Sequence, residues 1–201
     1  MSFNRLLSAL GIAVFLAACG KPAEDPAKTP AAPTQAGPVA PPAAAPAEAA
    51  TVSVALDSEG LRLVTETGST RLLAFGRPTA EAVEVLTGVL GAPANRSVNQ
   101  ECGAGPTEFV EYGNGLTALF LDGRFTGWSA DRESAELVTF MNGVGVGSTR
   151  QQLTEAFADL TVEESTLGLE FTAGEVSGLL DKDGPTGKVQ AIWAGTSCVF
   201  R

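Results

Sequence analysis

The chain contains no histidine among its 201 residues. This absence excludes Ser-His-Asp and Cys-His catalysis and every metal site that depends on a histidine ligand. It also removes the side chain that most often carries protons near neutral pH. The sequence offers no other recognisable catalytic constellation, so we expect a protein that is not an enzyme and that uses no cofactor or metal ion.

Basic residues are also scarce, with 13 Lys and Arg against 23 Asp and Glu and a net charge of −10. The whole imbalance belongs to residues 51–201, because residues 1–50 hold three side chains of each sign. Nucleic-acid binding depends on clustered basic side chains, which release counterions from phosphate, so nucleic acid is not an expected partner. Anionic lipid headgroups would repel the acidic domain as well, so membrane attachment has to come from another source.

No apolar run is long enough to cross a membrane. The longest N-terminal one, residues 6–18, falls short of the roughly 20 residues that a spanning helix needs, but it suits a signal peptide that starts with Arg5. The run ends in Leu16-Ala17-Ala18-Cys19, which resembles the lipobox of bacterial lipoproteins. The resemblance implies that a signal peptidase recognises Leu16, Ala17 and Ala18, removes residues 1–18 and leaves an acylated Cys19 as the membrane anchor. Because Gly20 follows rather than Asp, the lipoprotein sorting rule implies the periplasmic face of the outer membrane in a Gram-negative cell.

Residues 19–50 have the composition of a tether. Eight of the 12 prolines lie between Pro22 and Pro46, among many alanines and almost no large apolar residues. Such a segment can neither sustain a helix nor bury a core. Residues 51–201 are long enough to form one domain with its own core, so we expect a single domain there.

Cysteine is rare too, with three in the chain. If Cys19 is acylated, Cys102 and Cys198 are the two cysteines that remain. In an oxidising compartment this even number predicts a disulfide between them. In the chain-entropy treatment, closing a loop of about 97 residues stabilises a fold by at most about 4–5 kcal/mol. The alternative is a reactive thiol, for which the sequence supplies neither a CxxC motif nor a histidine.

The pattern of apolar residues and turns predicts strands and helices in a recurring order. The Asn114-Gly115 and Asp122-Gly123 dipeptides are strong hairpin signals within one three-stranded meander. A capping-box pattern at residues 148–151 opens a second helix with Leu153, Phe157 and Leu160 on one side. The predicted elements are strands over 52–56, 61–64 and 71–75, a helix over 80–90, strands over 108–112, 116–121 and 124–129, the second helix, and strands over 169–172, 176–180 and 188–194.

The order of a helix followed by a meander occurs twice, over about residues 72–140 and 141–201. Glu108-Phe109 matches Glu170-Phe171, and residues 116–119 match residues 176–179, whereas Trp128 and Trp193 fall one place out of register. We therefore predict an α+β domain whose antiparallel sheet is built from two helix-plus-meander units after an N-terminal hairpin, with the helices on one face. This arrangement resembles the tandem units of β-lactamase inhibitory protein and of the barrel-assembly lipoprotein BamE.

A second resemblance rests on the segments 101–106, 162–168 and 192–201, which are similar to those of an uncharacterised group of bacterial lipoproteins. Some members of that group carry an aspartate-semialdehyde dehydrogenase label. The chain has no N-terminal dinucleotide fingerprint and no histidine beside a catalytic cysteine, so that activity does not transfer.

Two short segments resemble known binding motifs but lack residues that those motifs require. The segment 143–148 departs from nucleotide-binding loops, since position 148 is Ser and the P-loop lysine is missing. The segment 181–184 begins like a calcium loop, but it lacks the later acidic ligands and Pro185 interrupts it.

Three functions follow as hypotheses. The first is a lipoprotein with a non-catalytic interaction or structural domain, bound to the membrane by its lipid and to an envelope protein partner by its surface. Tyr112, Trp128 and Trp193 are either core residues or, in the case of Tyr112 and one of the two tryptophans, exposed anchors for that partner. The second is a small-ligand-binding lipoprotein. The third is an envelope hydrolase that uses carboxylates, for which the candidates are Glu163, Glu164, Glu170 and Asp181.

Overall fold

A computed structural model of the protein describes residues 51–132 and 138–199. These residues all fall within the compact unit Ala45–Arg201. The predicted signal peptide over residues 1–18, the lipidated Cys19 and the tether up to residue 50 lie outside the described residues.

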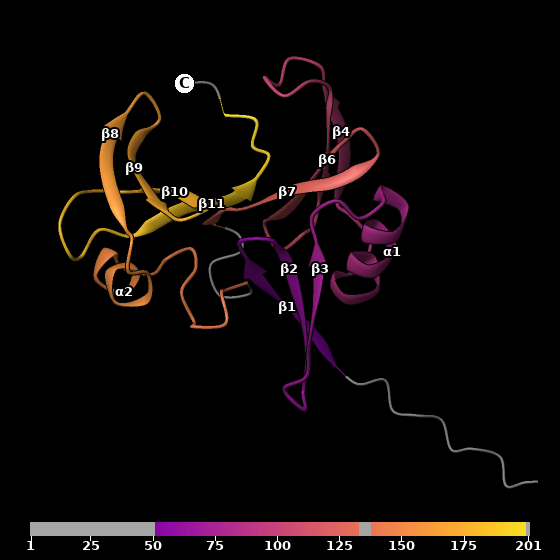
Figure 1. Ribbon diagram of the computed structural model, residues 1–201, viewed down its shortest axis with the longest axis horizontal. Helices are drawn as coiled ribbons and strands as arrows, with labels where there is room; N and C mark the ends of the chain where they lie inside the picture. The colour runs from indigo at the N-terminus through magenta and orange to yellow at the C-terminus, as the bar shows by residue number, and fades with distance from the viewer. Residues whose placement is uncertain (1–50, 133–137, 200–201) are drawn as a thin grey trace, which may run out of the picture. The chain divides into compact units, whose positions relative to one another are not determined.

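The N-terminal part of the domain is a small antiparallel sheet of three strands in the order β1-β2-β3 (Figure 1). Its strands are β1 (Val52–Asp57), β2 (Gly60–Thr65) and β3 (Thr70–Ala74). The predicted hairpin is therefore one part of a three-stranded sheet, because the segment after the second strand turns back and pairs along its free edge.

A larger antiparallel sheet of eight strands follows, in the order β4-β5-β6-β7-β11-β10-β9-β8. The strands are β4 (Asn95–Asn99), β5 (Thr107–Glu111), β6 (Leu116–Leu121), β7 (Arg124–Ala130), β8 (Thr161–Ser165), β9 (Gly168–Ala173), β10 (Val176–Leu180) and β11 (Val189–Gly195). Each half of the sheet runs from an outer edge to the centre, where β7 and β11 pair through Trp128 opposite Ala194.

The two edge strands, β4 and β8, were not predicted from the sequence. Every residue of β4 except Asn99 is exposed, and Val98 is its one large apolar side chain. β8 has a similarly exposed pattern. An edge strand has a single neighbour and a largely solvated surface, so it needs little of the apolar alternation that reveals a strand in sequence.

The helices are α1 (Thr79–Leu90) and α2 (Arg150–Ala156). α1 agrees with the prediction and buries Ala82 and Leu86. α2 is shorter and starts one residue later than predicted, because Thr149 and Gln152 form the capping box in place of Ser148 and Gln151. Neither helix is long and apolar enough to cross a membrane, a finding that covers only the described residues.

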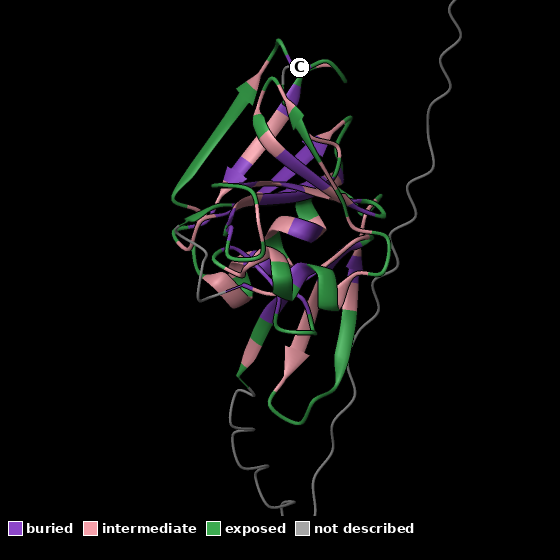
Figure 2. Cartoon of the chain, turned by 90° about the vertical axis from the view of Figure 1, so that its left-hand side faces the viewer, coloured by how far each residue is buried: buried purple, intermediate pink, exposed green. Residues whose placement is uncertain are grey.

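One core lies between the eight-stranded sheet on one side and the helices and small sheet on the other (Figures 1 and 2). Alternate strand residues point to it, as the pleat requires. Both helices contribute to this core, α1 through Leu86 and α2 through Leu153, and the small sheet contributes Leu56 and Leu61. The coarse prediction of an α+β domain with antiparallel strands is confirmed.

The pairing register corrects one detail of the predicted internal match. Ala118 pairs with Val110 in one half of the sheet, and Gly178 pairs with Phe171 in the other. Phe171 is fully buried in the core, whereas Phe109 lies beside Val110 and points to the opposite face. The match of Phe109 with Phe171 is thus wrong by one residue, because a shift of one position exchanges the two faces of a strand.

Candidate functional site

The predicted disulfide is confirmed: Cys102 and Cys198 are joined, with their Cα atoms 5.1 Å apart. Cys102 follows β4 and is buried, and the side-chain amide of Asn99 donates to Cys198 Sγ at 3.6 Å. The bond fixes the residues after β11, 196–199, against the sheet. We refer to residues 196–199 as the C-terminal segment.

The C-terminal segment lies on the sheet face opposite the helices. Its Thr196 backbone N–H donates to the Thr126 carbonyl oxygen at 2.8 Å. Together with Phe109, Leu119 and Trp193 the segment encloses a cavity of about 110 Å³. Drug-sized ligands occupy pockets of roughly 300–1,000 Å³, so this one cavity is too small to hold such a ligand.

The aromatic residues predicted either to form the core or to anchor a partner all lie inside the domain. The exposed fractions of Tyr112, Trp128 and Trp193 are 3%, 0% and 7%. Trp128 faces the helices, and Trp193 faces the C-terminal segment. The interpretation as core residues is correct, and the interpretation as exposed anchors is wrong for all three.

Two of the four candidate carboxylates come together. Glu163 in β8 is directly opposite Glu170 in β9, and cross-strand partners share one face of a sheet. Glu170 is buried, with an exposed fraction of 5%, whereas Glu163 is exposed.

The other two candidates lie elsewhere. Glu164 is the neighbour of Glu163 in β8 and so points to the opposite face. Asp181 lies just past β10, where its Oδ1 accepts a hydrogen bond from the Lys188 backbone N–H at 2.7 Å. None of the four carboxylates lines the cavity beside the C-terminal segment.

The two short motifs have structural roles. Ser148 Oγ accepts a hydrogen bond from the Gly145 backbone N–H at 3.1 Å, which holds the glycine-rich turn before α2. A Cβ atom at Gly145 would lie 2.9 Å from the Val138 carbonyl oxygen, so glycine permits this close approach. Asp183 pairs with Arg150, and no group of three or more potential metal ligands occurs within residues 51–132 and 138–199.

An open cleft of about 460 Å³ lies where four segments of the chain meet. We call it the α2 cleft, because the residues that follow α2 form one wall. Its lining residues are Asp57 and Ser58, Phe140, the run Ala156, Phe157, Ala158 and Asp159, and the run Ala173, Gly174, Glu175 and Val176.

Aromatic side chains connect the floor of the α2 cleft to the core. The rings of Phe140 and Phe157 meet edge to face with centroids 5.5 Å apart, and Phe140 contacts Trp128 in the same way at 5.9 Å. Phe140 is buried and Trp128 is fully buried, so the floor rests on rigid packing. Such ring pairs contribute about 0.5–1.5 kcal/mol each beyond the area that they bury.

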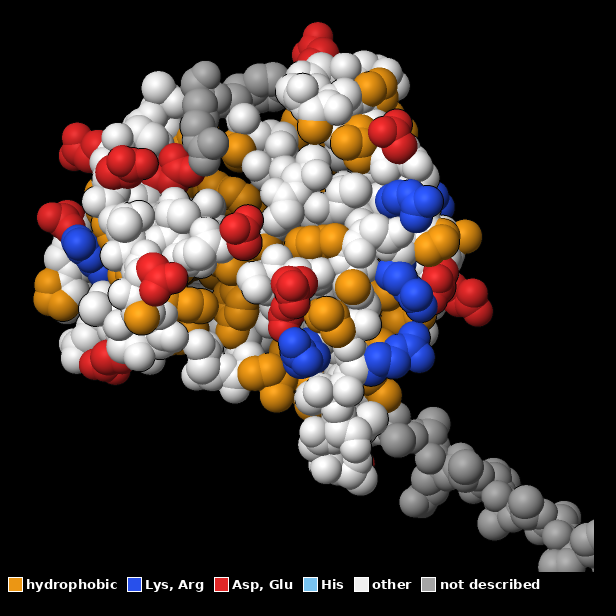
Figure 3. All heavy atoms as spheres, in the orientation of Figure 1, with side chains coloured by type: hydrophobic (Ala, Val, Ile, Leu, Met, Phe, Trp, Pro, Cys, Tyr) orange, Lys and Arg blue, Asp and Glu red, His pale blue; other side chains and the backbone are white. Residues whose placement is uncertain are grey.

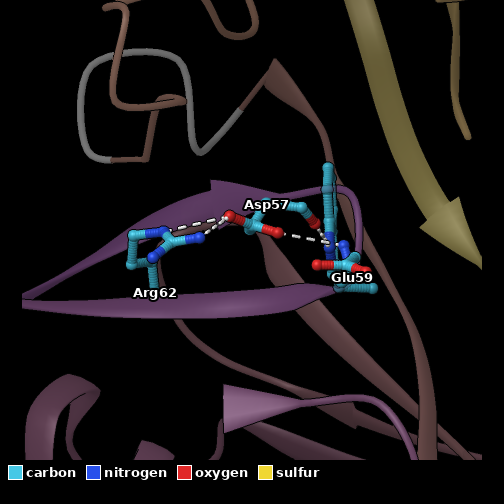
Figure 4. A network of polar contacts seen from close by, with 4 residues as sticks. Asp57, Glu59 and Arg62 are labelled. Atoms are coloured by element: carbon cyan, nitrogen blue, oxygen red, sulfur yellow. Dashed lines mark hydrogen bonds and ion pairs between the residues drawn. The ribbon is translucent and has the colours of Figure 1, made fainter. Parts of the chain in front are cut away.

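Asp57 lies at one side of the cleft, and its negative charge is paired with Arg62. Its Oδ2 accepts a hydrogen bond from Arg62 Nε at 3.0 Å, and its Oδ1 accepts one from the Glu59 backbone N–H at 3.0 Å (Figure 4). These contacts fix the turn between β1 and β2, so this wall of the cleft is preorganised.

The two other carboxylates at the cleft are uncompensated. Asp159 and Glu175 are both exposed, and neither forms a hydrogen bond or ion pair with another described residue. Residues 141–199 hold eight acidic and three basic side chains. The three basic residues, Arg150, Lys182 and Lys188, do not line the cleft. Figure 3 shows acidic and hydrophobic side chains interspersed over much of one face.

The α2 cleft was not predicted from the sequence. Its lining comes from segments between Asp57 and Val176 that follow strands or a helix, and no local pattern relates them. The one available signal was Phe157, which was predicted to lie on a helix face but ends α2 and contacts Phe140.

Comparisons with family models, with curated proteins and with solved structures found no match for this chain.

Proposed function

We propose that the chain is a lipid-anchored protein of the bacterial cell envelope whose folded domain binds another protein and catalyses no reaction. Cys19 carries the lipid after residues 1–18 are removed, and the Pro/Ala-rich residues 20–50 connect the anchor to the domain. Of the possible membranes, the outer membrane is favoured by Gly20. The acidic surface is consistent with attachment by lipid, since anionic headgroups repel it.

The observation that supports binding over hydrolysis is that none of the four candidate carboxylates lines the α2 cleft or the cavity beside the C-terminal segment. Carboxylate hydrolysis needs two carboxyl groups on either side of a substrate in one cleft. Glu163 and Glu170 share a sheet face, but Glu164 and Asp181 point elsewhere and the α2 cleft is lined by none of them. The cleft instead combines the half-buried Ala156 and Phe157 with a polar edge, and the centre of a protein interface is more apolar than its rim.

We also infer that the eight-stranded sheet consists of two equivalent units. Each unit is a helix followed by four strands that run from an edge to the centre, α1 with β4–β7 and α2 with β8–β11. The sequence match equates Ala118 with Gly178. Because Ala118 pairs with Trp128 and Gly178 pairs with Ile192, Trp128 then corresponds to Ile192. Trp193 corresponds to Ser129 instead, which agrees with the one-place offset of the two tryptophans in the sequence.

The anchor is tested by lipid labelling. Cells expressing the full-length chain are grown with an alkyne-tagged fatty acid, and the wild type is compared with Cys19→Ser. We expect the label and the membrane association to disappear in the variant, since no other residue of the chain is proposed to carry lipid. A Cys19→Ser protein that keeps the label would contradict the proposal.

The binding function is tested separately. Envelopes are treated with a reversible crosslinker, and the wild-type chain is purified beside an unrelated domain fused to the same residues 1–50. We expect a protein enriched with the wild-type chain over this lipidated control. Equal recovery with both would remove the support for an interaction domain.

A further inference from the structure

We propose that the α2 cleft binds a cationic, Lys- or Arg-containing segment of the partner protein, with the side chain of one basic residue seated on the Phe140–Phe157 floor. This inference deepens the proposed binding function and rests on it. It names the surface and the chemistry of the segment that the surface accepts.

The floor of the cleft suits the stem of a long basic side chain. The half-buried Phe157 and Ala156 supply apolar surface there, next to the small exposed part of the buried Phe140. Lys and Arg bury their methylene groups along such surfaces while the charged group stays at the edge. A guanidinium or ammonium group beside an aromatic ring is attracted by the ring quadrupole.

The negative charges at the cleft favour a positively charged ligand. Asp159 and Glu175 lack a counter-charge among the described residues, whereas Asp57 is already paired with Arg62. Two free carboxylates at the mouth of an apolar cleft can form charge-assisted hydrogen bonds with a guanidinium group, which are about twice as strong as neutral ones. An acidic segment would instead bring like charges together at the interface, which disfavours binding.

The acidic surface of the domain also favours its encounter with such a partner. Residues 141–199 have five more acidic than basic side chains, and their Arg150 is already paired with Asp183. A surface of one sign raises the association rate of a partner of the opposite sign. The cleft is open, so a side chain that projects from a protein segment can enter it.

The experiment uses site-specific photocrosslinking in cells that express the full-length, lipidated chain. Benzoylphenylalanine replaces Ala158, which is exposed and lines the cleft, or Ala80, an exposed alanine at the start of α1 that serves as the control position. Crosslinked peptides are then sequenced by mass spectrometry. We expect a protein adduct at Ala158 whose crosslinked segment contains Lys or Arg, and a weaker or different adduct at Ala80.

Charge reversal makes the test specific. Asp159→Lys with Glu175→Lys should lower the yield of the Ala158 adduct about tenfold or more, as expected when charge-assisted hydrogen bonds become repulsions. The matched control reverses Glu66 and Glu84, two exposed carboxylates outside the cleft, and should leave the yield nearly unchanged. Circular dichroism of all purified variants confirms that each is folded.

Other results of the crosslinking experiment would contradict the cleft proposal, the binding function or both. An Ala158 adduct to a segment without Lys or Arg, an adduct to lipid alone, or an equal loss in both reversal variants overturns the cleft proposal. A protein adduct at Ala80 but not at Ala158 also overturns it, while the proposed binding function stands. Adducts at neither position, together with no enrichment from crosslinked envelopes, contradict both.

Discussion

The indole nitrogen of Trp128 donates a hydrogen bond to the backbone carbonyl oxygen of Asp57 at 2.8 Å. Trp128 belongs to β7 at the centre of the eight-stranded sheet, and Asp57 ends β1 of the small sheet. The bond therefore connects the two sheets across the core. It also holds the end of β1 where Asp57 contributes to the α2 cleft.

Replacing Trp128 with Phe should lower the stability of the fold. The variant loses a buried hydrogen bond, worth about 0.5–1.5 kcal/mol, and leaves a cavity, so we expect a total loss of about 2–4 kcal/mol in the free energy of unfolding. The matched control is Trp193→Phe. Trp193 is also buried, but within the described residues its side chain forms no hydrogen bond, so its loss should be smaller. Urea unfolding of both variants measures the difference, and equal losses would contradict a role for the bond.

Removing the disulfide should destabilise the domain and release the C-terminal segment. Losing a native disulfide from a small secreted domain costs about 2–5 kcal/mol. We expect Cys102→Ser with Cys198→Ser to lower the urea midpoint by the corresponding amount, and reduction of the wild type to have the same effect. Proteolysis should then cut near Thr196, whose backbone contact with Thr126 is no longer supported. An unchanged midpoint after reduction would show that the bond contributes nothing to stability.

Elements with clear turn residues and apolar runs in the sequence were predicted best. The hairpin between β6 and β7 was predicted from the Asp122-Gly123 dipeptide. In the structure both residues have positive φ angles, 50° and 74°, as a tight hairpin turn requires. The apolar runs on either side, ending in Phe120 and beginning at Phe125, are buried. Where turn chemistry and burial agree, the sequence predicts the element correctly.

The remaining differences have physical causes. β4 and β8 are polar edge strands with no apolar alternation, so their pairing is evident only once the neighbouring strands are placed. The α2 cleft is lined by residues as distant in the chain as Asp57 and Phe140, which tertiary packing alone brings to one place. The disulfide could be predicted because counting cysteines needs no knowledge of the fold.

Two glycines should respond in opposite ways to alanine. A Cβ atom at Gly127 in β7 would lie 2.1 Å from the carbonyl oxygen of Thr196, so Gly127→Ala must displace the C-terminal segment. We expect a loss of about 1–3 kcal/mol, the usual cost of overpacking. Gly88 lies inside α1, where a Cβ atom would meet nothing within 4 Å beyond the helix's own backbone, so Gly88→Ala should stabilise the fold by about 0.5–1 kcal/mol. Thermal unfolding of both variants tests the pair, and a destabilising Gly88→Ala or a neutral Gly127→Ala would contradict the packing described for that residue.

Tyr112 should make stability depend on pH at the alkaline end. Burial raises the pKa of its phenol above the ordinary value of 10.0, with smaller opposing contributions from Thr87 and Arg96. The folded state thus holds the phenolic proton more tightly than the unfolded state does. The stability linked to this proton is complete below pH 10 and is lost as the pH rises through the raised pKa of the folded state.

Tyr112→Phe removes the titrating group while keeping the ring in the core. We expect the free energy of unfolding, measured in urea between about pH 8 and pH 11, to fall more steeply with pH for the wild type than for the variant. Other groups titrate in the same range, so the difference between the two slopes is the relevant quantity. Parallel slopes would show that the phenol ionises equally easily in the folded and unfolded states, contrary to its burial in the core.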